Sequence, residues 1–409
     1  MAGIVRDSNG NFGGGGQDRG VPWAIRPPGP YPVCPKPMER TEPTAYWDYL
    51  HIDELLSLQS GLAADEGAIE GDEVLFITVH QVFELWFKLV IQELRAARNL
   101  FHRENVAEQE LSGAVSSLQR IITILRVAAH HFEVVETLST REYLKFRNKL
   151  MPASGFQSAQ MRQMEALMGL EEHERIPLGK PGTHMRALEN ADGTPSSSME
   201  RVLSEIADRP NLKQAIEAWL LRTPIDGCAH DAPDAEAHLD TFVANYLASH
   251  GREVDDAQHH AEALSLSEEK ERIDAMYAKE RASVEAFLKP GDDEGGRRTA
   301  RLRAAMLFIE TYRDLPLLSW PRKILSSLIE LEQVFLVFRQ RHARMVERVI
   351  GRRVGTGGSA GVDYLDKTAL EYRIFGDLWA IRTILVKSGA EPDLEHADYY
   401  GFVADKRES

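Results

Sequence analysis

Apolar residues recur at intervals of three and four along most of the chain, and this spacing restricts the fold more than any other feature. The clearest segment spans residues 71–101, where the recurring positions are Phe76, Val79, His80, Phe83, Phe87, Val90, Ile91 and Leu94. Apolar residues lie on more than one side of this helix, so we expect it deep in the core. No segment alternates with a period of two for long enough to predict a strand. The sequence therefore predicts an all-α fold.

The other predicted helices share this period, and turns rich in glycine and proline separate them. They cover about residues 46–58, 108–132, 139–150, 161–168, 199–222, 234–250, 257–288, 297–314, 320–350 and 364–389. Residues 1–40 are rich in glycine and proline, and we expect a flexible tail there. We expect residues 41–409 to form one helical-bundle domain with a variable helical insertion at about 171–300.

The overall charge and the cysteines exclude several classes of protein. The 409 residues carry 63 acidic and 48 basic side chains, a formal net charge of −15, which argues against a nucleic-acid partner. The two cysteines, Cys34 and Cys228, form no CxxC motif, which argues against a disulfide framework or a cysteine zinc site and favours a cytoplasmic location. We find no signal peptide and no apolar run long enough for a bilayer, so we expect no membrane association.

Two histidines on apolar helix faces are the first candidates for chemistry. His80 lies on the stripe within 71–101, and His342 lies on a stripe with Phe338 and Met345. A neutral imidazole on an apolar helix is what a proximal haem ligand requires. Arginines that could neutralise haem propionates flank His342, namely Arg341, Arg344 and Arg348. For both histidines, the residues alone leave open a structural role in the core with both ring nitrogens hydrogen-bonded.

Two further patterns could bind a ligand. Residues 355–361 (GTGGSAG) let the backbone approach a ligand closely, and Thr356 brings a hydroxyl group. The segment lacks the Gly-Lys-Ser/Thr ending and the preceding strand of a P-loop, so we reject that interpretation. Tyr143 and Arg147 share a helical face, and an arginine can bind a carboxylate through two hydrogen bonds. The residues alone leave open that 355–361 is a flexible linker between two helices and that Arg147 is an ordinary surface arginine.

Taken together, and in their order along the chain, these motifs resemble the tryptophan 2,3-dioxygenase family. Residues 76–88 (FITVHQVFELWFK) resemble the family's distal helix, and residues 152–158 (PASGFQS) resemble its loop over the substrate pocket. The segment from Arg341 through Ser359 resembles its proximal helix and substrate loop, and residues 46–53 resemble its N-terminal helix. The resemblance extends over about residues 44–390 and is poor within 171–300.

The resemblance implies an all-helical homotetramer with haem b that inserts O2 across the indole C2–C3 bond of L-tryptophan to give N-formylkynurenine. It implies that His342 is the axial ligand of the haem iron and that His80 lies on the distal side, near the indole nitrogen. The other implied roles are carboxylate binding by Arg147, ammonium binding by Thr356, pocket lining by Phe76, Tyr143 and Ser154, cofactor contact by Gly355 and Gly357, and entry into a neighbouring subunit's site by Tyr46, Tyr49 and Leu50.

Two residues depart from the family pattern and motivate an alternative function. Trp47 stands where the family usually carries glycine, and Ala360 stands where serine is common. A related haem monooxygenase or oxygenase acting on a substituted tryptophan or another indole, in specialised metabolism, is therefore a second hypothesis. A third is a non-catalytic sensor that binds haem and indole. The sequence leaves open the exact substrate, the number of oxygen atoms inserted and the role of residues 171–300.

Overall fold

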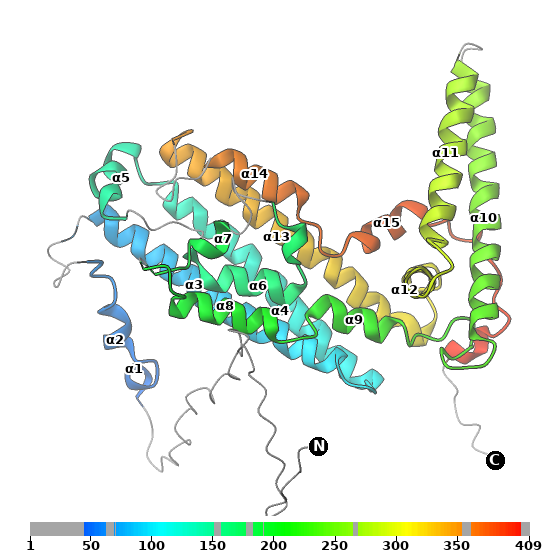
Figure 1. The fold of residues 1–409 in the computed structure, drawn as a ribbon, viewed down its shortest axis with the longest axis horizontal. Helices are drawn as coiled ribbons and strands as arrows, with labels where there is room; N and C mark the ends of the chain where they lie inside the picture. Colours follow the sequence, from blue (N-terminus) through cyan, green and yellow to red (C-terminus); the bar gives the residue numbers. More distant parts are fainter. Residues whose placement is uncertain are drawn as a thin grey trace, which may run out of the picture. The chain divides into compact units, whose positions relative to one another are not determined.

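The computed structural model describes residues 45–62, 69, 71–150, 157–176, 183–190, 192–264, 269–353 and 361–401. The described residues form α- and 3-10 helices and no β-strand, with two isolated bridges, Glu189–Pro195 and Ile225–Cys228. The predicted all-α fold is confirmed (Figure 1). The predicted tail at 1–40 lies outside the described residues, and the single domain with an insertion at 171–300 stays a prediction.

The chain divides into two units, residues 1–53 and 54–409. In the first unit the described residues contain helix α1 (Tyr46–Tyr49), which is followed by the short helix α2 (Ile52–Leu56). None of the residues of α1 is buried. The predicted partner-facing residues Tyr46, Tyr49 and Leu50 have exposed fractions of 74%, 73% and 42%.

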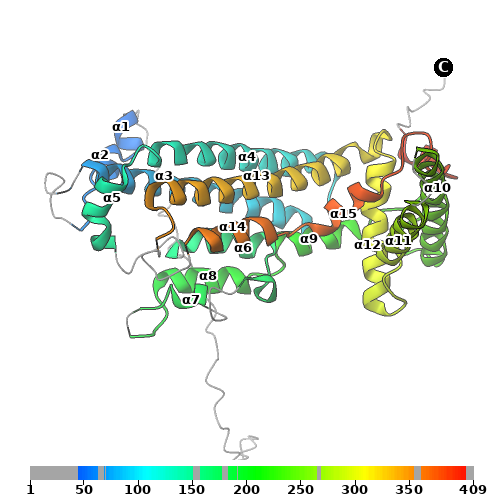
Figure 2. The ribbon, with the colours of Figure 1, turned by 90° about the horizontal axis from the view of Figure 1, so that it is seen from above.

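Three long helices build the centre of the second unit: α3 (Gly71–Phe101), α4 (Glu108–Val135) and α13 (Ser319–Ile350). Helix α4 packs against both of the others, as Figures 1 and 2 show. Their apolar side chains recur at helical spacing and are buried where the helices face each other. This places the faces that carry His80 and His342 in the interior of the bundle.

Shorter helices cover this centre. Helix α6 (Ala159–Met168) packs against α3 and α8 (Ser197–Ala207), while α9 (Leu212–Leu220) packs against α3. Helix α14 (Val362–Glu371) packs against α13, and α5 (Thr140–Phe146) continues into the 3-10 turn η2 (Arg147–Leu150). Serine side chains cap three of these helices by accepting backbone N–H bonds, namely Ser139, Ser158 and Ser196. Two short pieces, η4 (Glu172–Glu174) and α7 (Thr183–Arg186), lie between the predicted helices 161–168 and 199–222.

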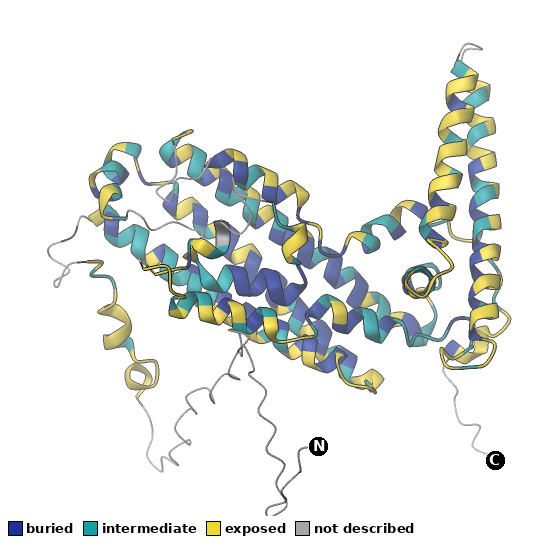
Figure 3. Ribbon diagram, in the orientation of Figure 1, coloured by how far each residue is buried: buried dark blue, intermediate teal, exposed yellow. Residues whose placement is uncertain are grey.

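The remaining helices include a long antiparallel hairpin. Helix α10 (Ala235–Leu264) packs against α11 (Lys270–Leu288), and both present many exposed side chains (Figure 3). Then come α12 (Glu294–Thr311), η6 (Pro316–Leu318), α15 (Gly376–Ile384) and η7 (Ala397–Tyr400). The buried Tyr246 of α10 fixes the end of α15, because its hydroxyl donates to Ile384 O at 3.0 Å and accepts from Val386 N at 3.1 Å.

The predicted helices 199–222 and 364–389 are each divided in the structure, for identifiable reasons. The predicted helix 199–222 is α8 and α9, because Asn211 begins a new helix through a reciprocal capping box with Gln214. The predicted helix 364–389 breaks before α15. There the buried carboxylate of Glu332 accepts the backbone N–H groups of Ile374 and Phe375, which therefore need no helical partner. Tertiary contacts thus set boundaries that periodicity alone does not.

Helix α3 is long and apolar enough to cross a membrane by length and composition, so the expectation that no apolar run is long enough was wrong. Its polar side chains nevertheless contact other helices of the same unit. The Glu84 carboxylate accepts from Ser158 Oγ at 2.7 Å, and Glu73 forms an ion pair with Lys149 at 2.7 Å. These contacts are typical of a helix in the core of a folded bundle. Such a helix is apolar on several sides because the surrounding helices cover it.

Candidate active site

A cluster of phenylalanine rings joins the three central helices. The ring centroid of Phe83 on α3 lies 4.8 Å from that of Phe132 on α4 and 5.9 Å from that of Phe338 on α13. Phe132 and Phe338 lie 5.1 Å apart, and all three side chains are buried. Such tilted and edge-on packing fixes the rings in place. The cluster therefore forms a rigid apolar wall, and both candidate histidines adjoin it.

His342 stacks on this wall. Its ring lies 5.4 Å from that of Phe132, with 11° between the two planes. Burial is the main cause that lowers the pKa of His342 to about 4, and the electrostatic influence of His80 and Arg162 acts in the same direction. The imidazole is therefore neutral at neutral pH and keeps the lone pair that a metal ligand needs.

His80 has a defined tautomer. Its Nδ1 lies 2.7 Å from the carbonyl oxygen of Phe76, one helical turn earlier. A carbonyl can only accept, so Nδ1 carries the proton and Nε2 presents a lone pair. Burial lowers the pKa of His80, although the Phe76 hydrogen bond and the Glu84 charge oppose this change. The Nε2 atom of His80 is therefore a neutral hydrogen-bond acceptor beside the phenylalanine wall.

Tyr143 and Arg147 extend the site from α5. The Tyr143 ring lies 6.2 Å from that of Phe76, whose own ring lies 4.0 Å from that of His80. Burial raises the pKa of Tyr143, and the charge and hydrogen bond of Arg147 oppose this change. The structure thus brings four predicted residues into one chain of contacts: Arg147, Tyr143, Phe76 and His80. Their ligand-binding roles are not tested by these contacts.

A buried ionic cluster beside this site was not predicted from the sequence. The Glu165 carboxylate on α6 lies 2.7 Å from Arg162 Nη1, 2.7 Å from Arg175 Nη1 and 2.8 Å from Arg339 Nη2. Burial by itself would raise the pKa of Glu165, but the three guanidinium groups lower it to about 2. Arg339 also lies over the rings of Phe335 and Tyr372, at 4.5 and 4.6 Å from their centroids.

Three guanidinium groups share this buried carboxylate, and Arg175 also pairs with Glu172 at 3.4 Å, so three positive charges face two negative ones. The buried Nε of Arg162 has no hydrogen-bond partner among the described residues, and Arg162 is close enough to His342 to lower its pKa. The cluster is therefore suited to an additional anionic group. A sequence signal existed, because Arg162 and Glu165 stand three residues apart in a short helix that also carries three methionines, and Arg339 precedes His342 on another helix.

The arginines expected to neutralise haem propionates have other partners. Arg341 contacts Glu133 and Glu136 on α4, and Arg348 also contacts Glu136. Arg344 pairs with Glu347 and Asp366. These ion pairs connect α13 to α4 and α14, so their observed role is structural.

A matching family model decides the relationship of the chain to known proteins. The model described as tryptophan 2,3-dioxygenase matches residues 34–385. This chain belongs to the tryptophan 2,3-dioxygenase family. It is 48% identical to "Tryptophan 2,3-dioxygenase" of Sorangium cellulosum over 88% of each chain. It is 45% identical to "Tryptophan 2,3-dioxygenase 2" of Ralstonia nicotianae, over 89% of this chain and 99% of that protein. The resemblance that the motifs indicated is thereby confirmed.

Another relative is shorter than this chain. The "Tryptophan 2,3-dioxygenase-like protein" of Xanthomonas campestris is 48% identical over 66% of this chain and 99% of its own length. Four predicted site residues of this chain lie outside the described residues: Ser154, Gly355, Thr356 and Gly357. Their roles stay predictions.

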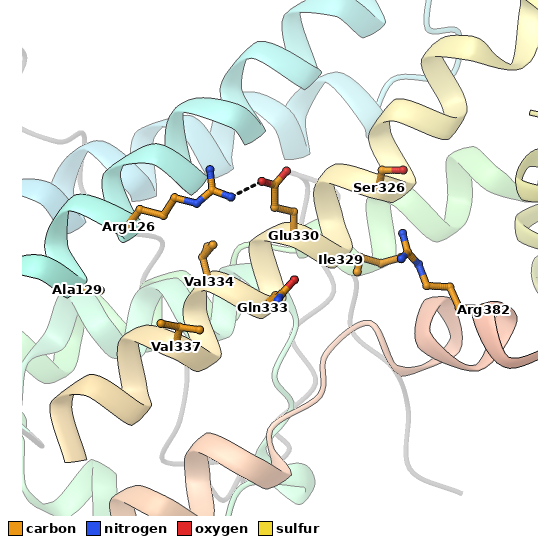
Figure 4. Close-up of a pocket in the computed structure, with 9 residues that line it drawn as sticks. All are labelled: Arg126, Ala129, Ser326, Ile329, Glu330, Gln333, Val334, Val337 and Arg382. Carbon is orange, nitrogen blue, oxygen red and sulfur yellow. Dashed lines mark hydrogen bonds and ion pairs between the residues drawn. The ribbon is translucent and has the colours of Figure 1, made fainter. Parts of the chain in front are cut away.

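A surface groove lies apart from the candidate site. It has a volume of about 470 Å³ and lies between α4, α13 and α15, as Figure 4 shows. The Arg126–Glu330 ion pair spans it, and the groove contains neither His80 nor His342. Its other lining residues are Ala129, Ser326, Ile329, Gln333, Val334, Val337 and Arg382. The candidate active site of this tryptophan 2,3-dioxygenase family member is therefore the region of His80, His342 and the phenylalanine wall.

Proposed function

We propose that this chain is a haem-dependent dioxygenase that inserts O2 across the indole C2–C3 bond of L-tryptophan and releases N-formylkynurenine. Membership of the tryptophan 2,3-dioxygenase family supports oxidation of tryptophan. The single structural observation that carries the proposal is the stacking of the His342 imidazole on Phe132, within the same phenylalanine cluster that His80 adjoins through Phe83. Two neutral histidines from different helices then serve one site with different roles.

The residues of this chain fit haem b. His342 would bind the iron, the phenylalanine wall would contact the porphyrin, and the unpartnered Nε of Arg162 would bind a propionate. When bound, haem supplies the iron chemistry that allows dioxygen to react with the indole ring. The protein supplies the orientation of the substrate and the exclusion of water.

Substrate orientation is assigned to the Tyr143–Arg147 pair. Arg147 would bind the tryptophan carboxylate through its guanidinium group, and the Tyr143 hydrogen bond would hold that group in place. Thr356 would bind the ammonium group, while Phe76 and Ser154 would line the pocket. Fixing both ends of the amino acid holds the indole ring in one position and removes the entropic cost of orientation from the reaction step.

His80 is assigned to the indole nitrogen. Because Nδ1 donates to Phe76 O, Nε2 is available to accept the indole N–H. Burial keeps the imidazole neutral by lowering its pKa, so this acceptor persists near neutral pH. The hydrogen bond would select the orientation in which C2 and C3 are presented for oxygenation.

We further propose a cytoplasmic homotetramer. Large apolar side chains are exposed on α1 in this single chain, including Tyr46 and Tyr49, and exposed apolar groups of this size commonly mark interfaces. Tyr46, Tyr49 and Leu50 would enter the site of a neighbouring subunit, and Gly355 and Gly357 would let the backbone approach the cofactor. Sedimentation of the haem-loaded protein at several concentrations tests the tetramer.

Labelled oxygen tests the reaction. We expect the reduced protein, given L-tryptophan and then ¹⁸O2, to yield N-formylkynurenine with two labelled atoms. One labelled atom would instead support the monooxygenase hypothesis that Trp47 and Ala360 motivate. Spectral changes on indole binding without oxygen consumption would support the sensor. Either result contradicts the dioxygenase proposal.

Arg147 can be tested with a substrate that lacks the carboxylate. Losing a charged hydrogen bond costs about 1.5–3 kcal/mol, so Arg147→Ala should raise the KM for L-tryptophan about ten- to a hundredfold. It should hardly change the KM for tryptamine. Arg141→Ala is the matched control, because Arg141 is an exposed arginine on α5, the helix that continues into the turn holding Arg147. Equal effects on both substrates would contradict carboxylate binding.

A further inference from the structure

Three side chains that commonly bind metals meet outside the candidate active site. Cys228 Sγ lies 3.8 Å from Asp234 Oδ1, and Asp234 Oδ2 lies 3.3 Å from His238 Nε2. One ligand atom from each residue lies within 4.8 Å of the other two. The active-site contacts involve none of the three, and Asp234 joins the other two through a hydrogen bond from the thiol and a contact with the imidazole.

The observed spacing is close to that of a tetrahedral zinc site. With zinc–nitrogen and zinc–oxygen distances of about 2.0–2.1 Å and a zinc–sulfur distance of about 2.3 Å, tetrahedral edges are about 3.4 Å for nitrogen–oxygen and about 3.5 Å for sulfur–oxygen. The His238–Asp234 separation is measured at Oδ2 and already matches, whereas the Cys228–Asp234 separation is measured at Oδ1 and is a few tenths of an ångström too long. Rotation of the Asp234 and Cys228 side chains would bring the thiol and the imidazole around the same carboxylate oxygen.

The backbone that carries Cys228 is held in place. Ile225 and Cys228 exchange two backbone hydrogen bonds of 3.1 and 3.0 Å across a tight turn. The two central residues, Asp226 and Gly227, have φ values of +46° and +77°. A side chain at Gly227 would place its Cβ 2.8 Å from His396 Cβ, so the close approach of the C-terminal segment requires glycine here.

The C-terminal segment clamps the same turn through hydrogen bonds. The Asp226 carboxylate accepts from the backbone nitrogens of Glu395 and His396, at 3.0 and 2.9 Å. The Tyr400 hydroxyl accepts from Gly227 N and donates to Pro224 O. Cys228 is therefore positioned before any metal binds. Asp234 and His238 are positioned too, because they stand four residues apart at the start of α10.

We propose that Cys228, Asp234 and His238 bind one Zn²⁺ ion, with water as the fourth ligand. A thiolate and a carboxylate would balance the charge of the ion, while the imidazole stays neutral. Sulfur and nitrogen ligands favour Zn²⁺ over Mg²⁺ and Ca²⁺, which prefer oxygen alone. The ion would connect the 225–228 turn to α10. The absence of CxxC, which argued against a cysteine zinc site, does not apply to this mixed set of ligands.

Zinc binding can be measured on the tag-free, full-length, haem-loaded protein by competition with a chromophoric chelator. We expect one zinc equivalent beyond any background, and we expect Cys228→Ser and His238→Ala each to weaken binding by more than about a hundredfold. His260→Ala, an exposed histidine on the same helix, should bind like the wild type. X-ray absorption at the zinc edge should show a single sulfur neighbour at about 2.3 Å.

Reactivity of the thiol gives an independent measurement. In a Cys34→Ser background, Cys228 is the single thiol of the chain, and zinc should slow its alkylation by iodoacetamide in proportion to site occupancy. If Cys228→Ser does not fold, the zinc affinity of His238→Ala still tests the proposal. No zinc uptake, a zinc site without sulfur, or unchanged affinity in His238→Ala would overturn the proposal. Tryptophan turnover should be unaffected in all of these variants.

Discussion

Charged residues behave differently in the active-site bundle and in the α10–α11 hairpin. In the bundle, Glu165 is buried among three arginines, and its pKa falls to about 2. In the hairpin, the Asp255–Arg281 pair has a similar separation of 2.6 Å, but its side chains keep exposed fractions of 56% and 34%. The comparison shows that the distance between two paired charges says little about how much the pair contributes to the stability of the fold. Burial decides, because solvent weakens the exposed pair and cannot reach the buried one.

The same contrast applies to histidines, and it gives the largest expected effect. We expect His342→Ala to lose haem and activity completely, while His260→Ala in the hairpin keeps both. His80→Ala should keep haem but lose most turnover, because its assigned role concerns the substrate. The Soret absorbance of purified protein measures haem content. Retention of haem by His342→Ala, with its axial ligand unchanged spectroscopically, would refute the assignment of His342.

The next largest effect concerns the buried cluster. Glu165→Gln would leave Arg162, Arg175 and Arg339 without their shared carboxylate, and breaking a buried ion pair costs about 3–5 kcal/mol. Urea denaturation of the haem-free protein measures this loss. Glu271→Gln on α11 is the control, because Glu271 is exposed. Equal stabilities of the two variants would show that the cluster contributes nothing.

Acid should destabilise the bundle through the same carboxylate. The pKa of Glu165 is about 2 in the folded protein against 4.5 for the free side chain, so the folded state favours the ionised form. This contribution is complete above pH 4.5 and is lost as the pH falls from 4.5 toward 2. The shift corresponds to about 3 kcal/mol. Unfolding free energies measured from pH 5 downward should fall more steeply for wild type than for Glu165→Gln. Parallel curves would contradict the assignment.

Periodicity predicted most of the long helices, because a buried helical face leaves a repeating apolar pattern. It predicted α3 and the helix carrying His342 with nearly correct ends, and it placed both histidines on buried faces. It missed the break before α15, which depends on Glu332, a residue some forty positions away. It also missed the Glu165 cluster, since no local pattern shows that Arg175 and Arg339 approach one carboxylate from separate segments.

The hairpin provides the smallest expected effect and the sharpest control on the comparison. Asp255→Asn removes the charge that pairs with Arg281, but Arg281 keeps hydrogen bonds to Gly251 O at 3.2 Å and Gln258 Oε1 at 3.3 Å. Because water screens the exposed pair, we expect no measurable change in unfolding free energy and no change with added salt. Urea denaturation at low and high ionic strength measures both. A loss comparable to that of Glu165→Gln would mean that exposure does not separate the two regions, and the distinction between structural and solvated charges would fail.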